Sequence, residues 1–207
     1  EYTGVPVFEG LAAYPMLLIE LDGSETEVCR QSEILTDWLS RHSLGFRVAK
    51  SEEEAKSLWQ VRRQGSSAMK KLASTKLNED VVVPLDQQVD LVRFVESLRL
   101  QFNLKIGVFG HCGDGNLHVN FMYNEEDEEE TTRSVEALNS LMKKVIELGG
   151  AISGEHGIGL AKTPFVRDQF NQAEWEVMKS IKQSLDPKGI LNPGKIFQIF
   201  KPWEEEK

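Results

Sequence analysis

The sequence predicts an α+β fold with one largely antiparallel β-sheet and helices packed on one face of it. The first observation is the order of hydrophobic patterns, strand–helix–strand–helix–strand–helix–strand–strand–helix, along the 207 residues. The second is that two consecutive apolar segments are separated only by a short Gly-rich turn, which is typical of an antiparallel hairpin. This order resembles two split βαβ units side by side.

Five short apolar segments are expected to form the strands. The first, PMLLIELDG, contains an unbroken apolar run and ends in an Asp-Gly turn, which is typical of a buried strand. Another ends at Pro84, because proline has no N–H to donate to a sheet. We expect strands at residues 15–23, 45–50, 79–84, 105–110 and 117–123.

Five longer segments have helical spacing or residues that begin helices. Ser51 and Glu54 form a capping box, in which two side chains satisfy backbone N–H groups of the first turn. Asp86 and Asn171 suit the N-cap position of two later helices. The acidic run EEDEEE suits a helix N-terminus, and Gly149 suits the end of the same helix. We expect helices at residues 26–43, 52–73, 86–102, 125–148 and 171–185.

Composition limits the classes of protein to consider. Hydrophobic residues make up 40% of the chain, and the net charge of -9 without a Lys/Arg cluster argues against a nucleic-acid binder. No apolar run reaches membrane-spanning length, so we expect no transmembrane segment. Two cysteines do not make a disulfide framework, which favours a cytoplasmic chain, free or attached peripherally to a membrane. The start at Glu1 suggests a processed chain or a part of a longer one.

The segment GHCGDGNLHVN places two histidines on either side of a Gly-rich turn. Asp-Gly at 114–115 is the preferred pair for a two-residue turn, which would put His111 directly opposite His118. Opposite Cβ atoms lie about 4.5–5.5 Å apart, so the two imidazoles can share one divalent metal. Cys112 would point to the other face. The alternative is a hairpin whose two histidines stack or bond to the backbone.

A third ligand is available in AISGEHGIGLAK, residues 151–162. Adjacent side chains in an extended or turn segment point apart, so Glu155 can bind the metal while His156 faces a substrate as general base. Two histidines and one carboxylate with open positions are a recurring catalytic arrangement, which zinc, manganese and iron all accept. The alternative is an ordinary surface loop with a Glu-His pair.

One arginine is expected on the buried side of the second helix. Leu58 and Trp59 mark that side, and Arg62 follows at the next helical step, whereas Arg63 points elsewhere. An inward arginine needs an anion, and a carboxylate matches best because it accepts two parallel hydrogen bonds. The alternative is an arginine that extends its charged end to solvent or pairs with an internal acidic residue.

Taken together, the motifs resemble a known family. GHCGDGNLHVN is similar to the GHxGDGNxH signature, SGEHGIGLAK to GEHGxGxxK, and LDPKGILNPGKIF to LDPxxxxNPGK. With LWQVR at 58–62, they resemble the C-terminal half of the FAD-linked oxidases of the glycolate oxidase, D-lactate dehydrogenase and D-2-hydroxyglutarate dehydrogenase group, in the vanillyl-alcohol-oxidase superfamily. The resemblance implies a ferredoxin-like substrate (cap) domain at 1–150 and a flavin-facing C-terminal segment at 151–207. The N-terminal FAD-binding half of the family is expected to be absent from the chain.

The resemblance also implies a role for each residue that matches a motif. His111, His118 and Glu155 would bind the divalent metal. His156 would be the base that takes the hydroxyl proton of the substrate, and Arg62 would hold the substrate carboxylate.

Further residues are implied near the flavin and the substrate. Asn192 of the NPGK motif would lie near FAD, with Lys195 as a weaker candidate, and Glu155 would serve cofactor binding through the metal. Family members use polar residues near the third strand for the substrate, for which Lys76 and Asn78 are the candidates here.

The implied activity is oxidation of a small 2-hydroxy acid to the 2-oxo acid, with hydride transfer to FAD and onward transfer to a protein or quinone acceptor. The chain without a flavin-binding half is expected not to turn over.

Two other classes of function are compatible with the ligand set. One is a metal-dependent hydrolase that uses metal-activated water, and the other is a non-catalytic subunit that docks to a separate FAD protein. The NPGK motif argues against the hydrolase, because a hydrolase has no use for a flavin-facing segment.

Overall fold

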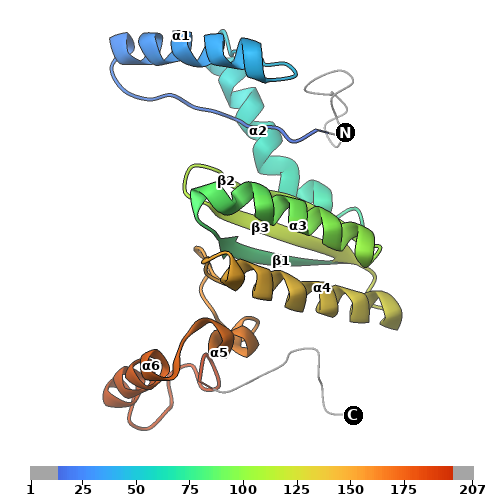
Figure 1. Cartoon of the computed structure of the whole chain (residues 1–207), viewed down its shortest axis with the longest axis vertical. Coiled ribbons are helices and arrows are strands. Elements are labelled where there is room, and N and C mark those ends of the chain that lie inside the picture. Colours follow the sequence, from blue (N-terminus) through green and yellow to red (C-terminus); the bar gives the residue numbers. More distant parts are fainter. Residues whose placement is uncertain (1–13, 198–207) are drawn as a thin grey trace. The chain divides into compact units, whose positions relative to one another are not determined.

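In the computed structural model, which describes residues 14–197, three strands form one antiparallel sheet. The strands are β1 (Thr75–Val82), β2 (Lys105–His111) and β3 (Asn116–Tyr123), in the order β1-β3-β2. β1 and β2 run in the same direction with β3 between them, and α3 (Gln88–Gln101) connects them as a split βαβ unit. α4 (Glu128–Glu147) follows β3, beside α3 (Figure 1). The predicted α+β fold with helices on one face of an antiparallel sheet is confirmed.

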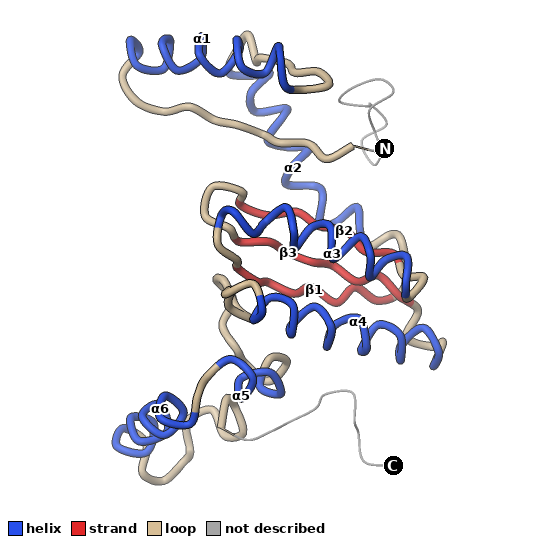
Figure 2. The backbone as a smooth tube through the Cα atoms, in the orientation of Figure 1, coloured by secondary structure: helices blue, strands red, loops and turns tan. Residues whose placement is uncertain are grey.

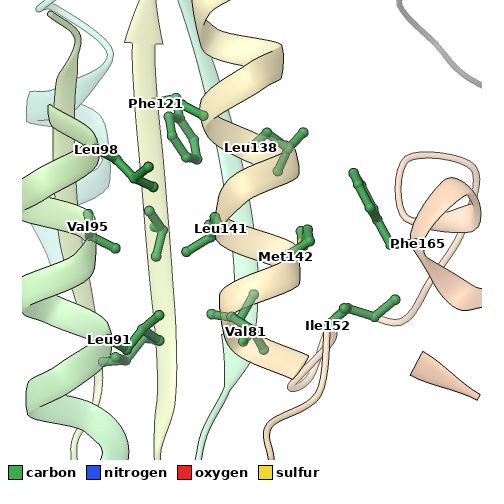
Figure 3. Packing of buried hydrophobic residues seen from close by; sticks show 14 of the residues in the cluster. Val81, Leu91, Val95, Leu98, Phe121, Leu138, Leu141, Met142, Ile152 and Phe165 are labelled. Carbon is green, nitrogen blue, oxygen red and sulfur yellow. The ribbon is translucent and has the colours of Figure 1, made fainter. Parts of the chain in front are cut away.

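The hydrophobic core lies between the sheet and these two helices. Alternate residues of β3 point toward the helices, and α3 and α4 contribute rows of apolar side chains at helical spacing (Figure 3). The core residues with the least exposure include Val81, Leu91, Leu98, Val119, Phe121, Leu138, Leu141 and Met142. Because the core uses one face of the sheet, the other face is available for polar residues.

The segment after α4 returns to the sheet before the last helices. Ala151 forms an isolated bridge with Val82 at the end of β1. Phe165, at the end of the short helix η2 (Thr163–Phe165), joins the hydrophobic core. The segment is thus anchored at Ala151 by the bridge to β1 and at Phe165 by apolar packing. The chain continues through α5 (Val166–Gln169).

The helix caps agree with the sequence in part. The predicted N-cap at Asp86 is wrong, because Asp86 lies within the short helix η1 (Leu85–Gln87) and α3 begins after Gln87 without a side-chain cap hydrogen bond. Ser51 accepts the backbone N–H of Glu54 as predicted, but the Glu54 carboxylate accepts the backbone N–H of Lys50 instead of that of Ser51.

α6 (Gln172–Leu185) begins with a complete capping box between Asn171 and Glu174, as the N-cap assignment predicts. Figure 2 shows α5 and α6 as the last helices of the described chain. No helix in residues 14–197 is long and apolar enough to cross a bilayer.

The chain divides by compactness into two units, Glu1–Ala68 and Met69–Lys207. The first contains α1 (Glu25–His42) and most of α2 (Glu52–Met69), and neither helix has a fully buried side chain. This division follows compactness and does not test the functional boundary predicted at residue 150.

Two of the five predicted strands are wrong. Residues 15–23 and 45–50 form no strand, and apolar side chains such as Leu17 and Val48 are exposed there. A strand requires a neighbour for its backbone N–H and C=O groups, and no backbone hydrogen bond joins either segment to a strand in the described structure. An apolar pattern alone therefore did not suffice to form a strand.

Candidate functional site

The sheet face opposite the core carries polar side chains from two neighbouring strands. The register pairs Asn78 with Asn120 and Asp80 with His118, and residues paired across strands share a face. The β3 residues between them point into the core, so His118 and Asn120 lie on the polar side. The side chains of Asp80, His118 and Asn120 are nevertheless buried, and the segment after α4 covers Asp80 and His118.

His111 and His118 share this face without lying directly opposite each other. The turn occupies residues 112–115, so His111 pairs with Asn116 and His118 is offset by two positions. The predicted two-residue turn is therefore wrong, because Asp114 closes a longer turn by accepting the backbone N–H of Asn116 at 3.0 Å. The ring centroids of the two histidines are 6.1 Å apart, so a diagonal pair still brings the imidazoles together.

The SGEHG segment is folded around Asp80. Oδ2 of Asp80 accepts the backbone N–H groups of Gly154 at 3.0 Å, Glu155 at 2.8 Å and His156 at 2.8 Å. Its Oδ1 accepts the side-chain amide of Asn116 at 2.5 Å. Three successive N–H groups that converge on one oxygen form an anion-binding concavity, here filled by a side chain of the same protein.

This geometry brings Glu155 and His156 to the same side. Oε1 of Glu155 lies 3.0 Å from Nε2 of His118 and 3.6 Å from Nε2 of His156. The expectation that the two adjacent side chains point apart is therefore wrong, because the backbone curls around Asp80 instead of running extended. His111, His118 and Glu155 each present a ligand atom within 4.8 Å of the others, so the three predicted ligands converge.

A second set of possible ligands overlaps the first. Asp80, His118 and His156 also have ligand atoms within 4.8 Å of one another. A carboxylate offers about four lone-pair positions, and those of Asp80 already accept hydrogen bonds from the SGEHG segment and from Asn116. Because the oxygens of Asp80 are already occupied, the set with Glu155 is the better candidate for a metal site. The side chain of Glu155 is 52% exposed.

Burial and hydrogen bonding set the charges in the site. Burial lowers the pKa of His118, against the opposing effect of Glu155 and Asp80, so this imidazole is neutral at pH 7. Burial alone would raise the pKa of Asp80, but hydrogen bonds from the His156 backbone and the Asn116 amide hold it far below its ordinary value. Asp80 is therefore a buried anion.

A buried ion cluster beside the site had no role in the sequence prediction. Lys162 and Glu79 are 5% and 3% exposed, and Nζ of Lys162 lies 3.8 Å from Oε2 of Glu79. Nζ also donates to the backbone oxygen of Asp80. Burial raises the pKa of Glu79 to about 7, against the opposing effect of Lys162. The available signals were two adjacent acids in the apolar strand EDVVV and the last lysine of SGEHGIGLAK.

The predicted substrate residues lie in different parts of the chain. Arg62, on α2 of the first unit, is half-buried while Arg63 is exposed, as the helical spacing predicts. Lys76 lies on β1, on the face that carries Asp80. Burial lowers the pKa of Lys76, and the positive charge of Lys70 lowers it further. Oδ1 of Asn78 is buried and has no hydrogen-bond partner among residues 14–197.

The predicted flavin-facing residues lie after α6. Asn192 is exposed and has a positive φ of 48°, and Nζ of Lys195 donates to the backbone oxygen of Pro193 at 3.3 Å. The backbone N–H of Ile196 donates to the hydroxyl of Thr163 at 3.1 Å, which attaches this segment to η2. Within residues 14–197, no hydrogen bond joins Asn192 or Lys195 to the histidine cluster.

The fold and the site agree with a known class of flavoenzyme domain. Residues 8–196 match the FAD linked oxidases, C-terminal domain, and the chain belongs to this family.

Three relatives illustrate the similarity. The chain is 35% identical over 187 residues to the glycolate oxidase subunit GlcD of Bacillus subtilis, covering 90% of the chain and 40% of the relative. It is 32% identical over 195 residues to the same subunit of Escherichia coli, covering 94% and 38%. It is 33% identical over 196 residues to a D-lactate dehydrogenase of Anaerostipes hadrus, covering 91% and 40%. The chain thus spans at most 40% of the length of these relatives.

A solved structure shares the fold. The 4-ethylphenol oxidase from Gulosibacter chungangensis, in its isoeugenol complex, matches with a TM-score of 0.54 and 16% identity, covering 87% of this chain and 38% of that one.

Proposed function

We propose that this chain is the substrate-binding part of an FAD-dependent oxidoreductase that oxidises a 2-hydroxy acid of the glycolate, D-lactate or D-2-hydroxyglutarate type. The observation that carries the proposal is the convergence of His111, His118 and Glu155 beside His156. Glycolate oxidase subunits and D-lactate dehydrogenases among the similar proteins support the substrate class. Membership of the FAD-linked oxidase family gives no support to the hydrolase alternative.

The three converging residues fit a divalent metal. Two imidazoles and a carboxylate suit zinc, manganese or iron. Burial keeps His118 in the neutral form that a metal requires, and the exposed carboxylate of Glu155 leaves the site open to a substrate. A bound metal would lower the pKa of the substrate hydroxyl, as it does for bound water.

His156 is the proposed base. Its side chain is 51% exposed, so a substrate hydroxyl can reach the ring. Nε2 of the ring lies 3.6 Å from Oε1 of Glu155, so the proposed base is next to a proposed metal ligand. Arg62 would bind the substrate carboxylate through two parallel hydrogen bonds, and Lys76 would add a second cation on the polar face.

The polar face also fits completion by a further bound group. Oδ1 of Asn78 and Oδ1 of Asn120 are buried without partners among the described residues, and such acceptors need a donor from elsewhere. Bound FAD would accept the hydride from C2 of the substrate. We assign the flavin-binding half to the part of the relatives that this chain does not span, with Asn192 and Lys195 facing the flavin. A protein or quinone acceptor and a cytoplasmic location stay predictions.

Ligand binding to the purified chain tests the proposal. With Zn²⁺ present, glycolate, D-lactate and D-2-hydroxyglutarate are titrated beside acetate, propionate and glutarate, which lack the 2-hydroxyl. We expect at least one hydroxy acid to bind about tenfold or more tightly than its analogue, because only the hydroxy acid can chelate the metal through two groups. His118→Ala should remove the difference.

The matched control is His42→Ala. His42 is an exposed histidine at the end of α1, stacked on Trp38. This variant should keep the preference for the hydroxy acid. Equal affinities for every hydroxy acid and its analogue in the unaltered chain would contradict the proposal.

A further inference from the structure

The carboxylate of Asp80 is the centre of the contacts that shape the SGEHG segment. The residue is 0% exposed, and its Oδ2 accepts the hydroxyl of Ser153 at 3.3 Å in addition to three backbone N–H groups. Successive N–H groups reach one atom only when the backbone curls around it. The position of this oxygen therefore determines the path of the backbone that carries Glu155 and His156.

The same carboxylate is fixed to the sheet on its other side. Oδ1 is bound by the Asn116 amide at 2.5 Å, and Nζ of Lys162 lies 3.9 Å from Oδ2. Asp80 is itself a residue of β1, so the segment is attached to a rigid element. The network joins two adjacent strands and the segment after α4.

The space around Gly154 also shows how closely the segment packs on Asp80. A Cβ atom there would lie 1.8 Å from Nδ2 of Asn116 and 2.7 Å from Oδ1 of Asp80, which real Cβ atoms do not tolerate. The segment can therefore approach the carboxylate only with glycine at this position.

We propose that Asp80 is a positioning residue that holds Glu155 against His118 and His156 beside them, through its hydrogen bonds to the SGEHG segment. The role rests on the proposed function, because that reaction requires a preset ligand and base. Asp80 acts through the segment, since its oxygens are occupied by hydrogen bonds and its side chain is enclosed.

Asp80 could also act simply as a counter-charge for the buried ammonium of Lys162. Glu79 serves that second role too. Glu79 precedes Asp80 on β1, is similarly buried, and its Oε2 lies 3.8 Å from Nζ of Lys162. The hydrogen bonds of the SGEHG segment go to Asp80 and not to Glu79. Glu79→Gln is therefore the matched control for Asp80→Ala.

Amide hydrogen exchange of the purified chain, followed by NMR, tests the positioning role without metal, flavin or substrate. In Asp80→Ala we expect exchange at 154–156 to become about tenfold or more faster, because hydrogen bonds to a charged group are lost. The β3 amides of Val119 and Phe121 should stay protected. Glu79→Gln should leave 154–156 unchanged. Unchanged exchange at 154–156 in Asp80→Ala would overturn the proposal.

A second variant keeps the test decisive if Asp80→Ala does not fold. Gly154→Ala keeps every charge but its Cβ would collide with Asn116 and Asp80. We expect faster exchange at residues 155 and 156 with an intact β3. Retained protection at these residues would overturn the proposal.

Zn²⁺ binding on the same samples separates this role from the proposed function. We expect Asp80→Ala to weaken Zn²⁺ affinity about tenfold, because Glu155 is no longer held against His118. Faster exchange with unchanged Zn²⁺ affinity would overturn the positioning of Glu155. An unaltered chain that binds no Zn²⁺, with the exchange result as expected, would contradict the proposed metal site and still support the hold of Asp80 on the segment.

Discussion

Oε1 of Glu155 lies 3.0 Å from Nε2 of His118. His118 belongs to β3, the central strand of the sheet, and Glu155 belongs to the segment after α4. Asp80, on the neighbouring strand β1, determines where the two residues meet. The candidate site therefore depends on a junction between sheet and segment as much as on the histidine hairpin.

Glu79→Gln is expected to change how stability depends on pH. Burial raises the pKa of Glu79 from 4.5 to about 7, so between these pH values the native chain holds a proton that the unfolded chain has released. The free energy of unfolding contributed by this group therefore falls as pH rises through that window. The variant should lack this fall, which is about 1–3 kcal/mol between pH 5 and pH 8, since one pKa unit is about 1.4 kcal/mol.

Urea unfolding of both proteins at several pH values measures this difference. The lowered pKa of His118 acts in the opposite direction, but it is common to both proteins and cancels when they are subtracted. Identical pH dependence of the two proteins would show that Glu79 is not the group that takes up the proton.

Arg62→Ala is expected to weaken substrate binding in an enzyme assembled with its flavin-binding half. Loss of hydrogen bonds to a charged carboxylate should raise KM about 10–100-fold. The exposed neighbour Arg63 supplies the control, and Arg63→Ala should leave KM within about twofold. Steady-state kinetics decide, and equal KM values for the two variants would remove Arg62 from the substrate site.

His156→Gln separates a base from a metal ligand. A base should be dispensable for Zn²⁺ binding by the chain, while its loss should lower kcat of the assembled enzyme about 10²–10⁴-fold. Calorimetric titration with Zn²⁺ and single-turnover kinetics measure the two effects. A large loss of Zn²⁺ affinity would instead make His156 a ligand, in the second set with Asp80 and His118.

The predictable part of the fold is most of its helices and the β2–β3 hairpin, including α1 and α6, which have no buried side chain. β2, β3, α4 and α6 lie close to their predicted ranges, because hydrophobic spacing and caps are local signals. The predicted strands at 15–23 and 45–50 failed because pairing depends on a neighbour that a local pattern does not reveal.

The candidate site was predictable in its residues and less so in its geometry. Glycine-bounded histidines and Glu155 identify the three converging ligands from sequence alone. Asp80 and Lys162 were missed, because a charged residue in a strand shows its partners only when the fold brings distant segments together. The direction of Glu155 and His156 followed from those missed contacts.

Elemental analysis of the purified chain, incubated with zinc or manganese and then desalted, tests the central claim most directly. The matched samples are His118→Ala and His42→Ala, which remove a clustered histidine and an exposed one. The proposed site predicts about one divalent ion per chain in the unaltered protein and in His42→Ala, and none in His118→Ala. Equal metal content in all three proteins, or no metal in any of them, would contradict a metal site built from His111, His118 and Glu155.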